Sequence, residues 1–235
     1  MAFLESKYLY FMLLAFTIVY PISQSFEYRI QMYKKFKFLG FAISMMMLVF
    51  IPWDIYFTEE GIWWFNSSYI TEIYIFNLPV EEVLFFIFVP FACVFIYEVL
   101  NYFIKVDLLA SIVRPFLVLL SICLLFLAMQ YSGQLYTFVC FSSTGIALIV
   151  ILLINPIWLG KFLFAYFVTL IPFLFVNGIL TGSLIVSPVV NYNDAEIIGL
   201  RILTIPVEDF VYNLLMFLLV IAAYEKSSLI GQPKS

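Results

Sequence analysis

Long apolar runs recur along the whole chain. Seven of them approach the ~20 residues that an α-helix needs to cross a bilayer, and they are expected at 8–26, 38–53, 79–103, 115–131, 135–155, 162–180 and 206–224. The second run is the shortest. The uncharged stretch from 115 to 160 is too long for one helix, and the Tyr-Ser-Gly-Gln turn at 131–134 divides it. These runs predict an all-α polytopic membrane protein with about seven transmembrane helices.

Composition excludes several classes of protein. Of the 235 residues, 65% are hydrophobic and 11% are charged, whereas soluble chains are about 45–50% apolar and about 25% charged. So few charges cannot cover a surface that faces water. The net charge of −4 and the lack of a basic cluster argue against nucleic-acid binding. The chain has no His and no Gly-rich dinucleotide fingerprint, so we expect neither a metal nor a cofactor.

The distribution of Lys and Arg predicts the orientation, because cytoplasmic loops carry an excess of them. Lys7 and Arg201 are expected on one side of the membrane. The other nine of the eleven cations fall on the opposite side: Arg29, Lys34, Lys35, Lys37, Lys105, Arg114, Lys161, Lys226 and Lys234. We therefore expect a protein of the cell membrane with its N-terminus outside and its C-terminus in the cytoplasm. The loop from Asp54 to Leu78 carries four acids and no base, as an outer loop can.

An internal repeat is visible at an offset of 127 residues. Leu-Pro-Val-Glu-Glu at 78–82 corresponds to Ile-Pro-Val-Glu-Asp at 205–209, and the Tyr-Glu pair at 97–98 corresponds to that at 224–225. Asn66 likewise corresponds to Asn193. The matches predict two parallel three-helix repeats, at 1–107 and 135–235, joined by a linking helix at 108–134. Such a 3+1+3 arrangement has a pseudo-twofold axis along the membrane normal.

Four acids of the repeated motif are the candidate catalytic groups, and they could converge on one composite site: Glu81, Glu82, Glu208 and Asp209. One interpretation is helix capping, since Pro suits the first turn and acids there gain about 0.3–1 kcal/mol from the helix dipole. Capping explains one acid per helix better than two, and ionisable groups in a membrane usually mark function. In a chain without His, a carboxylic acid that keeps its proton in an apolar cavity is the available proton donor.

Other polar and aromatic residues could line the same site. Asp54, Asn177 and Thr181 are expected near the outer ends of the second and sixth spans, although they could equally be interfacial polar residues. Phe85 and Phe86 follow the first motif, where aromatic rings could stabilise a cation or simply pack.

Two further groups are expected at the membrane boundaries. Trp53, Trp63 and Trp64 are typical of the aromatic belt at the outer interface. Glu98 and Glu225 lie 17 residues beyond the motif acids, about 25 Å along their helices. They are expected at the cytoplasmic interface as snorkelling or helix-packing groups.

The two acidic motifs resemble the P-x-E-[ED] motifs of integral-membrane carotenoid (lycopene) cyclases. The first reads Leu-Pro-Val-Glu-Glu-Val-Leu-Phe-Phe at 78–86 and the second Ile-Pro-Val-Glu-Asp-Phe at 205–210. The segments at 177–182 and 192–201 are also similar to that family. The resemblance covers both halves, and so implies a natural fusion of the heterodimeric bacterial type, similar to the cyclase half of fungal fusion proteins.

The resemblance implies an intramolecular lyase that converts lycopene through γ-carotene to β-carotene by acid–base chemistry without redox change or flavin. Glu81 and Glu208 would form the acid–base set, in either assignment, with Glu82 and Asp209 in support. The implied partners are lycopene, membrane lipid and other enzymes of the carotenoid pathway. A cyclase of C50 carotenoids remains an alternative.

Two other classes of membrane protein have a similar topology. A 3+1+3 small-molecule transporter would be expected to have polar residues midway through its spans rather than acids at their ends. A microbial rhodopsin needs a Lys in the middle of its seventh span, and the stretch from Val207 to Tyr224 contains none.

Overall fold

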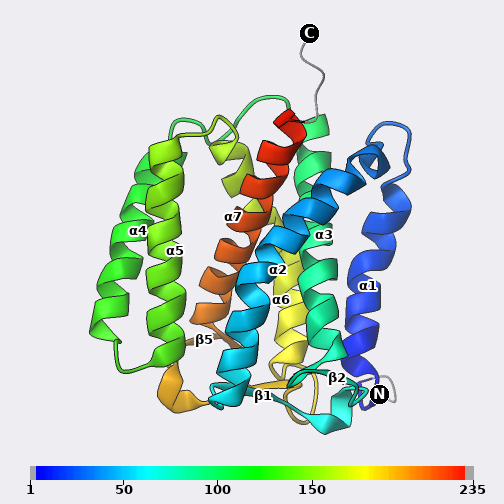
Figure 1. Cartoon of the computed structure of the whole chain (residues 1–235), viewed down its shortest axis with the longest axis vertical. Coiled ribbons are helices and arrows are strands. Elements are labelled where there is room, and N and C mark those ends of the chain that lie inside the picture. Colours follow the sequence, from blue (N-terminus) through cyan, green and yellow to red (C-terminus); the bar gives the residue numbers. More distant parts are fainter. Residues whose placement is uncertain (1–3, 231–235) are drawn as a thin grey trace. The chain divides into compact units, whose positions relative to one another are not determined.

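The computed structural model describes residues 4–230, so Lys234 lies outside the described part of the chain. The chain is mostly helical, which confirms the all-α prediction (Figure 1). The helices are α1 (Leu9–Gln24), α2 (Phe36–Glu59), α3 (Val80–Phe103), α4 (Val113–Gln130), α5 (Leu135–Ile154), α6 (Leu159–Leu180) and α7 (Val207–Ile230). Short 3₁₀ turns occupy Met32–Lys35, Ser67–Tyr69 and Asp194–Glu196.

Six of these helices are long and apolar enough to cross a membrane, and α1, with 16 residues, is shorter. The expected bounds of the second span were wrong. The helix α2 continues six residues past Trp53 and ends at Glu59, with Pro52 inside it. Asp54 interrupts the apolar pattern but lies within the helix and is buried. The loop that was expected to start at Asp54 therefore begins after Glu59.

Three two-stranded antiparallel sheets stand in the loops before α3 and α7, and the apolar pattern did not predict them. Each strand has only two or three residues, too few for a period-2 signal. One sheet joins β1 (Trp63–Phe65) to β4 (Val190–Tyr192). The other two are tight hairpins that lead directly into a helix: β2 (Tyr74–Ile75) with β3 (Leu78–Pro79), and β5 (Arg201–Ile202) with β6 (Ile205–Pro206).

The hairpins repeat the backbone geometry as well as the sequence. Phe76 and Leu203, which are 127 residues apart, both adopt a φ of 58° at the turn. This left-handed conformation is unusual for bulky side chains. Val80 N–H then bonds to Ile73 O at 2.7 Å, and the equivalent Val207 N–H bonds to Leu200 O at 3.0 Å. The helices that follow, α3 and α7, have 24 residues each.

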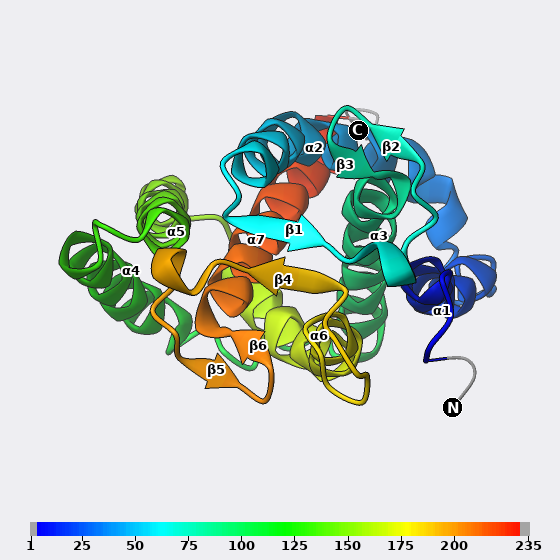
Figure 2. The same cartoon turned by 90° about the horizontal axis from the view of Figure 1, so that it is seen from below.

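The pairing of β1 with β4 is reciprocal. The strands β1 and β4 lie side by side (Figure 2). Trp63 lies opposite Tyr192 and Phe65 opposite Val190, so Trp64 and Asn191 form the central pair. The flanking bonds are equally reciprocal, since Asn66 N–H donates to Val189 O and Asn193 N–H donates to Ile62 O, both at 2.8 Å. Equivalent residues that exchange equivalent contacts are the signature of a twofold relation between the two strands. The division of the chain into two parallel three-helix repeats stays a prediction.

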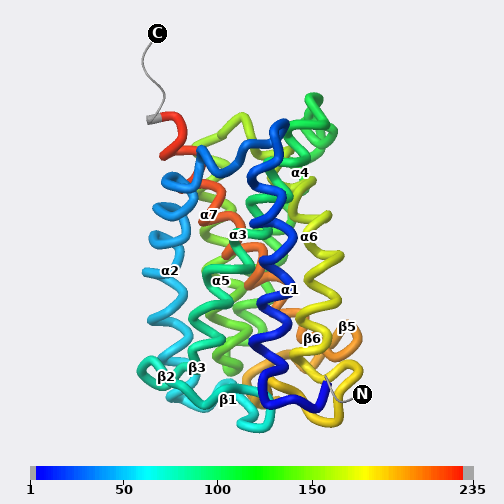
Figure 3. Tube along the Cα trace, turned by 90° about the vertical axis from the view of Figure 1, so that its right-hand side faces the viewer, coloured from blue at the N-terminus to red at the C-terminus, as the bar shows by residue number. Residues whose placement is uncertain are grey.

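The chain divides into two compact units. Unit 1 comprises Met1–Tyr56, Ser67–Lys105 and Met216–Ser235, and unit 2 comprises Phe57–Asn66 and Val106–Leu215. In unit 1, α1 packs against α3, and β2 and β3 lie at the end where both helices begin (Figure 3). In unit 2, α4 and α5 form the main helix pair (Figure 1).

Candidate active site

The first acid of the first repeat, Glu81, is held by the loop that precedes its own helix. Pro79 occupies the N-cap of α3, which places Glu81 in the first turn. The side chain is fully buried, and its Oε1 accepts a hydrogen bond from Thr71 N–H at 2.7 Å. Its Oε2 is buried and has no hydrogen-bond partner among residues 4–230. One oxygen is thus anchored and the other is not.

The second acid, Glu82, faces α1 and α2 within unit 1. Tyr10 in α1 donates its hydroxyl to Glu82 Oε2 at 2.6 Å, and both side chains are buried. The carboxyl group of Asp54, also buried, lies close enough to Glu82 for their charges to interact. Asp54 Oδ2 has no hydrogen-bond partner in the described chain. The structure therefore brings Asp54, predicted as a lining residue, near the second motif acid of its own repeat.

Glu208 repeats the arrangement of Glu81 in unit 2. Ile198 N–H, which is equivalent to Thr71 N–H, donates to Glu208 Oε1 at 2.7 Å. The Thr137 hydroxyl of α5 donates to the same oxygen at 2.6 Å. Glu208 is fully buried, and its Oε2 finds no partner within the described residues. Equivalent atoms of the two repeats are therefore anchored, and equivalent atoms are left without a partner.

Asp209 is held by three side-chain donors. Tyr136 donates to Oδ1 at 2.8 Å, while Tyr192 and Asn177 donate to Oδ2 at 2.8 and 2.9 Å. Asp209 itself is 6% exposed. Asn177, also predicted as a lining residue, thus contacts a motif acid directly. Its neighbour Thr181 bonds instead to the Thr204 hydroxyl at 2.8 Å.

Four aromatic rings gather beside Asp209 in unit 2, and sequence reasoning missed this cluster: Trp63, Tyr136, Tyr192 and Tyr212. Tyr136 and Tyr192 stack with centroids 6.0 Å apart, and Trp63 meets Tyr136 edge-on at 5.1 Å. The prediction that Trp63 belongs to an interfacial belt was wrong, because it is buried at 5% exposure. Trp64, at 49%, is exposed as a belt residue would be.

The predicted aromatic residues of the first repeat pack in a smaller group in unit 1. Phe86 is fully buried and contacts Phe85 edge-on, with ring centroids 5.5 Å apart. Phe86 also meets Phe50 of α2 at 6.0 Å, and Phe50 stacks on Trp53 at 5.7 Å. Trp53 is therefore part of this packed group rather than an isolated belt residue.

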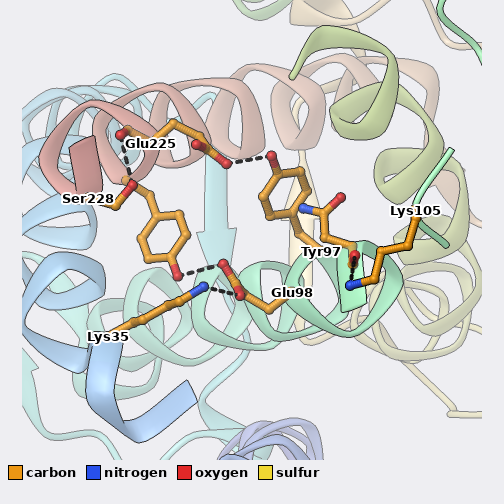
Figure 4. Close-up of polar contacts among 8 residues, drawn as sticks. Lys35, Tyr97, Glu98, Lys105, Glu225 and Ser228 are labelled. Atoms are coloured by element: carbon orange, nitrogen blue, oxygen red, sulfur yellow. Dashed lines mark hydrogen bonds and ion pairs between the residues drawn. The ribbon is translucent and has the colours of Figure 1, made fainter. Parts of the chain in front are cut away.

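The Tyr-Glu pairs at the far ends of α3 and α7 exchange hydrogen bonds reciprocally. Tyr97 donates to Glu225 at 2.6 Å, and Tyr224 donates to Glu98 at 2.7 Å (Figure 4). Lys35 also forms an ion pair with Glu98 at 2.5 Å. The helix-packing interpretation of these two glutamates agrees with these contacts, and we call the four-residue arrangement the Tyr–Glu clasp.

The chemistry that this arrangement offers is proton transfer in dry surroundings. Residues 4–230 contain no group of three or more Cys, Asp and Glu side chains that could hold a metal ion. Each motif instead presents a buried carboxyl group with one oxygen anchored by a backbone N–H. A buried polar atom without a partner costs about 1–3 kcal/mol, and such atoms in native proteins call for an explanation such as a catalytic role.

Comparison with known proteins points to one family. A family model described as lycopene cyclase matches residues 7–100 and 133–227, which include both acidic motifs. The two matched regions correspond to the two predicted repeats, and the whole of α4 lies between them. Searches of curated proteins and of solved structures found no match.

Proposed function

Since the chain belongs to the lycopene cyclase family, we propose that it closes the linear ends of lycopene into β-ionone rings, with γ-carotene as the one-ring intermediate and β-carotene as the product. The reaction is an isomerisation of each end. It needs an acid, a base, an apolar cavity and walls that stabilise a cation, but no reductant.

The proposed chemistry begins with proton transfer from a carboxylic acid to the terminal double bond of the substrate. The resulting tertiary cation is attacked by the next double bond, which closes the ring and moves the positive charge into it. A carboxylate then removes a ring proton, and that C–H electron pair becomes the ring double bond. One proton enters and one leaves, so the atoms and electrons of the substrate balance.

Glu81 and Glu208 are the residues that we propose for these proton transfers. The observation that carries the proposal is the matched pair of buried Oε2 atoms, each without a partner in the part of the chain described, on carboxyl groups whose Oε1 is fixed by an equivalent backbone N–H. A fixed carboxyl group with one oxygen unengaged can exchange a proton with a hydrocarbon that has no hydrogen-bonding groups of its own.

Glu82 and Asp209 act in support in this proposal, because side-chain donors engage Glu82 Oε2 and both oxygens of Asp209. In Glu81 and Glu208, by contrast, Oε2 has no partner among the described residues. The rings beside Asp209 supply faces that attract a cation, worth about 2 kcal/mol or more where water is excluded. Phe85 and Phe86 supply apolar surface near Glu81 and Glu82 in unit 1. Excluding water would also protect the cationic intermediate from being captured by it.

Isotope labelling tests the reaction. Purified protein in D₂O, given lycopene in lipid and no flavin or nicotinamide, should form β-carotene with one solvent deuterium in each ring, at the carbon that received the proton. γ-Carotene should precede it. Unlabelled product would contradict protonation by exchangeable acids, and an absolute need for reduced flavin would contradict the non-redox mechanism.

For the setting, we propose the cell membrane with the N-terminus outside and the C-terminus in the cytoplasm. The bias of Lys and Arg toward one set of loops supports this orientation. Reporters fused to each end test it. A C-terminal reporter should be active in the cytoplasm and an N-terminal one outside, and the reverse pattern would overturn the orientation.

A further inference from the structure

An apolar groove with two lysines at one end runs between α2 and α7 in unit 1. It has a volume of about 670 Å³, and seven of its ten lining residues are apolar. Lys37 stands at the start of α2, and Lys226 stands near the end of α7. Both lysines are exposed, and neither forms an ion pair with an acid in the described structure. We propose that this groove binds a phospholipid with an anionic headgroup.

The spacing of the lining residues makes the groove a continuous trough. On α2 the exposed Phe41, Met45 and Val49 recur at intervals of four and share one helix face. On α7, Leu219 and Ala223 are four residues apart and face the same trough. From Lys37 to Val49 the helix rises about 18 Å, close to the ~15 Å of one leaflet of a hydrocarbon core. The groove thus fits an acyl chain that begins at the lysines.

Charge complementarity selects the occupant. A phosphate at the lysine end would meet two ammonium groups, and basic pockets between transmembrane helices are known to take anionic lipid headgroups. A hydrocarbon polyene has nothing to offer those ammonium groups. The pair is also not part of the repeat, because the positions equivalent to Lys37 and Lys226 are Phe164 and Val99. The two lysines are therefore a feature of this groove and not of the repeat.

The test compares two lipids on the full chain in detergent micelles, with dissociation constants measured by native mass spectrometry. Phosphatidylglycerol should bind at least about tenfold more tightly than phosphatidylcholine of the same acyl chains. The double variant Lys37→Gln/Lys226→Gln should lose this preference. The control Lys105→Gln, at an exposed lysine outside the groove, should keep it.

A second variant distinguishes lipid binding in the groove from attraction of the lipid by the general charge of the surface. Ala223→Phe fills the trough and leaves both lysines, so it should weaken binding of both lipids; if it fails to fold, Val49→Phe does the same at a half-exposed position. Equal affinities of the native protein for the two lipids would overturn the proposal. So would an equal loss in Lys105→Gln, or displacement of phosphatidylglycerol by lycopene with no effect of the lysine substitutions.

Discussion

The two acidic motifs share their backbone and differ in their side-chain partners. In each repeat a hairpin leads into the helix, and a backbone N–H of the preceding loop anchors the first acid at 2.7 Å. The hydroxyls from the first helix of each repeat differ. Tyr10 and Thr137 occupy equivalent positions, yet Tyr10 reaches the second acid, Glu82, whereas the shorter Thr137 reaches the first acid, Glu208.

A neighbouring residue compensates in the second repeat. Tyr136 supplies the tyrosine hydroxyl to Asp209 there, and Asn177 adds an amide where the first repeat has Phe50. The backbone N–H that anchors the first acid is therefore common to both repeats. The side chains that surround the second acid differ between them. We infer that the first acids share one function, while the second acids tune each half separately.

The largest effect should come from the two first acids, and it should be similar in both repeats. Glu81→Gln and Glu208→Gln keep size and helix start but remove the exchangeable proton, so the rate of lycopene cyclisation should fall about 10²-fold or more. The rate is measured per molecule of purified protein in lipid vesicles. Glu60→Gln, at an exposed loop acid, is the control and should be unchanged.

If these acids were only helix caps, the outcome would be different. Each Gln variant would then cost about 1 kcal/mol of stability or less and keep most of its activity. A large loss in only one of the two would break the equivalence of the repeats and leave a single catalytic first acid.

How much of this site the sequence could predict depends on the range of each contact. The acids and their place at a helix start follow from a local motif, and the helices follow from apolar runs. The donors to Asp209 lie 17, 32 and 73 residues from it, so no local pattern connects them. The burial of Trp63 depends on the pairing of β1 with β4. A strand of three residues gives no recognisable sequence pattern, so the sequence alone suggested a belt residue.

The next effect should be confined to the second repeat. Asn177→Ala and Tyr192→Phe each remove one donor to Asp209 Oδ2. The poorer positioning of Asp209 should raise the activation free energy of cyclisation by about 1–1.5 kcal/mol and slow the reaction roughly tenfold. Tyr131→Phe in the α4–α5 turn is the matched control for the lost hydroxyl and should have no effect. Full activity in both site variants would show that Asp209 needs no fixed orientation.

A smaller effect should follow when Glu208 is made to resemble Glu81. Thr137→Val removes the hydroxyl and leaves the Ile198 N–H as the anchor of Oε1. Because one of two donors remains, cyclisation should slow only about two- to fivefold, equivalent to somewhat less than 1 kcal/mol. Thr169→Val, where the hydroxyl bonds within its own helix α6, is the control. A loss as large as that of Glu208→Gln would mean that Thr137 takes part in the proton transfer itself.

The smallest effects on cyclisation should come from the Tyr–Glu clasp, whose variants should change stability alone, and here symmetry and charge give different expectations. By symmetry alone, Tyr97→Phe and Tyr224→Phe should lower the unfolding midpoint of the purified protein equally. Lys35 breaks that equality, because it still pairs with Glu98 after the Tyr224 hydroxyl is removed. When Tyr97 loses its hydroxyl, by contrast, the carboxylate of Glu225 loses the one donor that the described residues give it.

We therefore expect Tyr97→Phe to destabilise the protein by about 1–2 kcal/mol and Tyr224→Phe by about 0.5–1 kcal/mol, with cyclisation unchanged in both. Thermal unfolding in one detergent, followed by circular dichroism, compares the two variants with the native protein. Adding Lys35→Gln to Tyr224→Phe should raise its cost to that of Tyr97→Phe. Equal midpoints before that addition would show that the ion pair adds nothing, because a half-exposed lysine gains little from its partner.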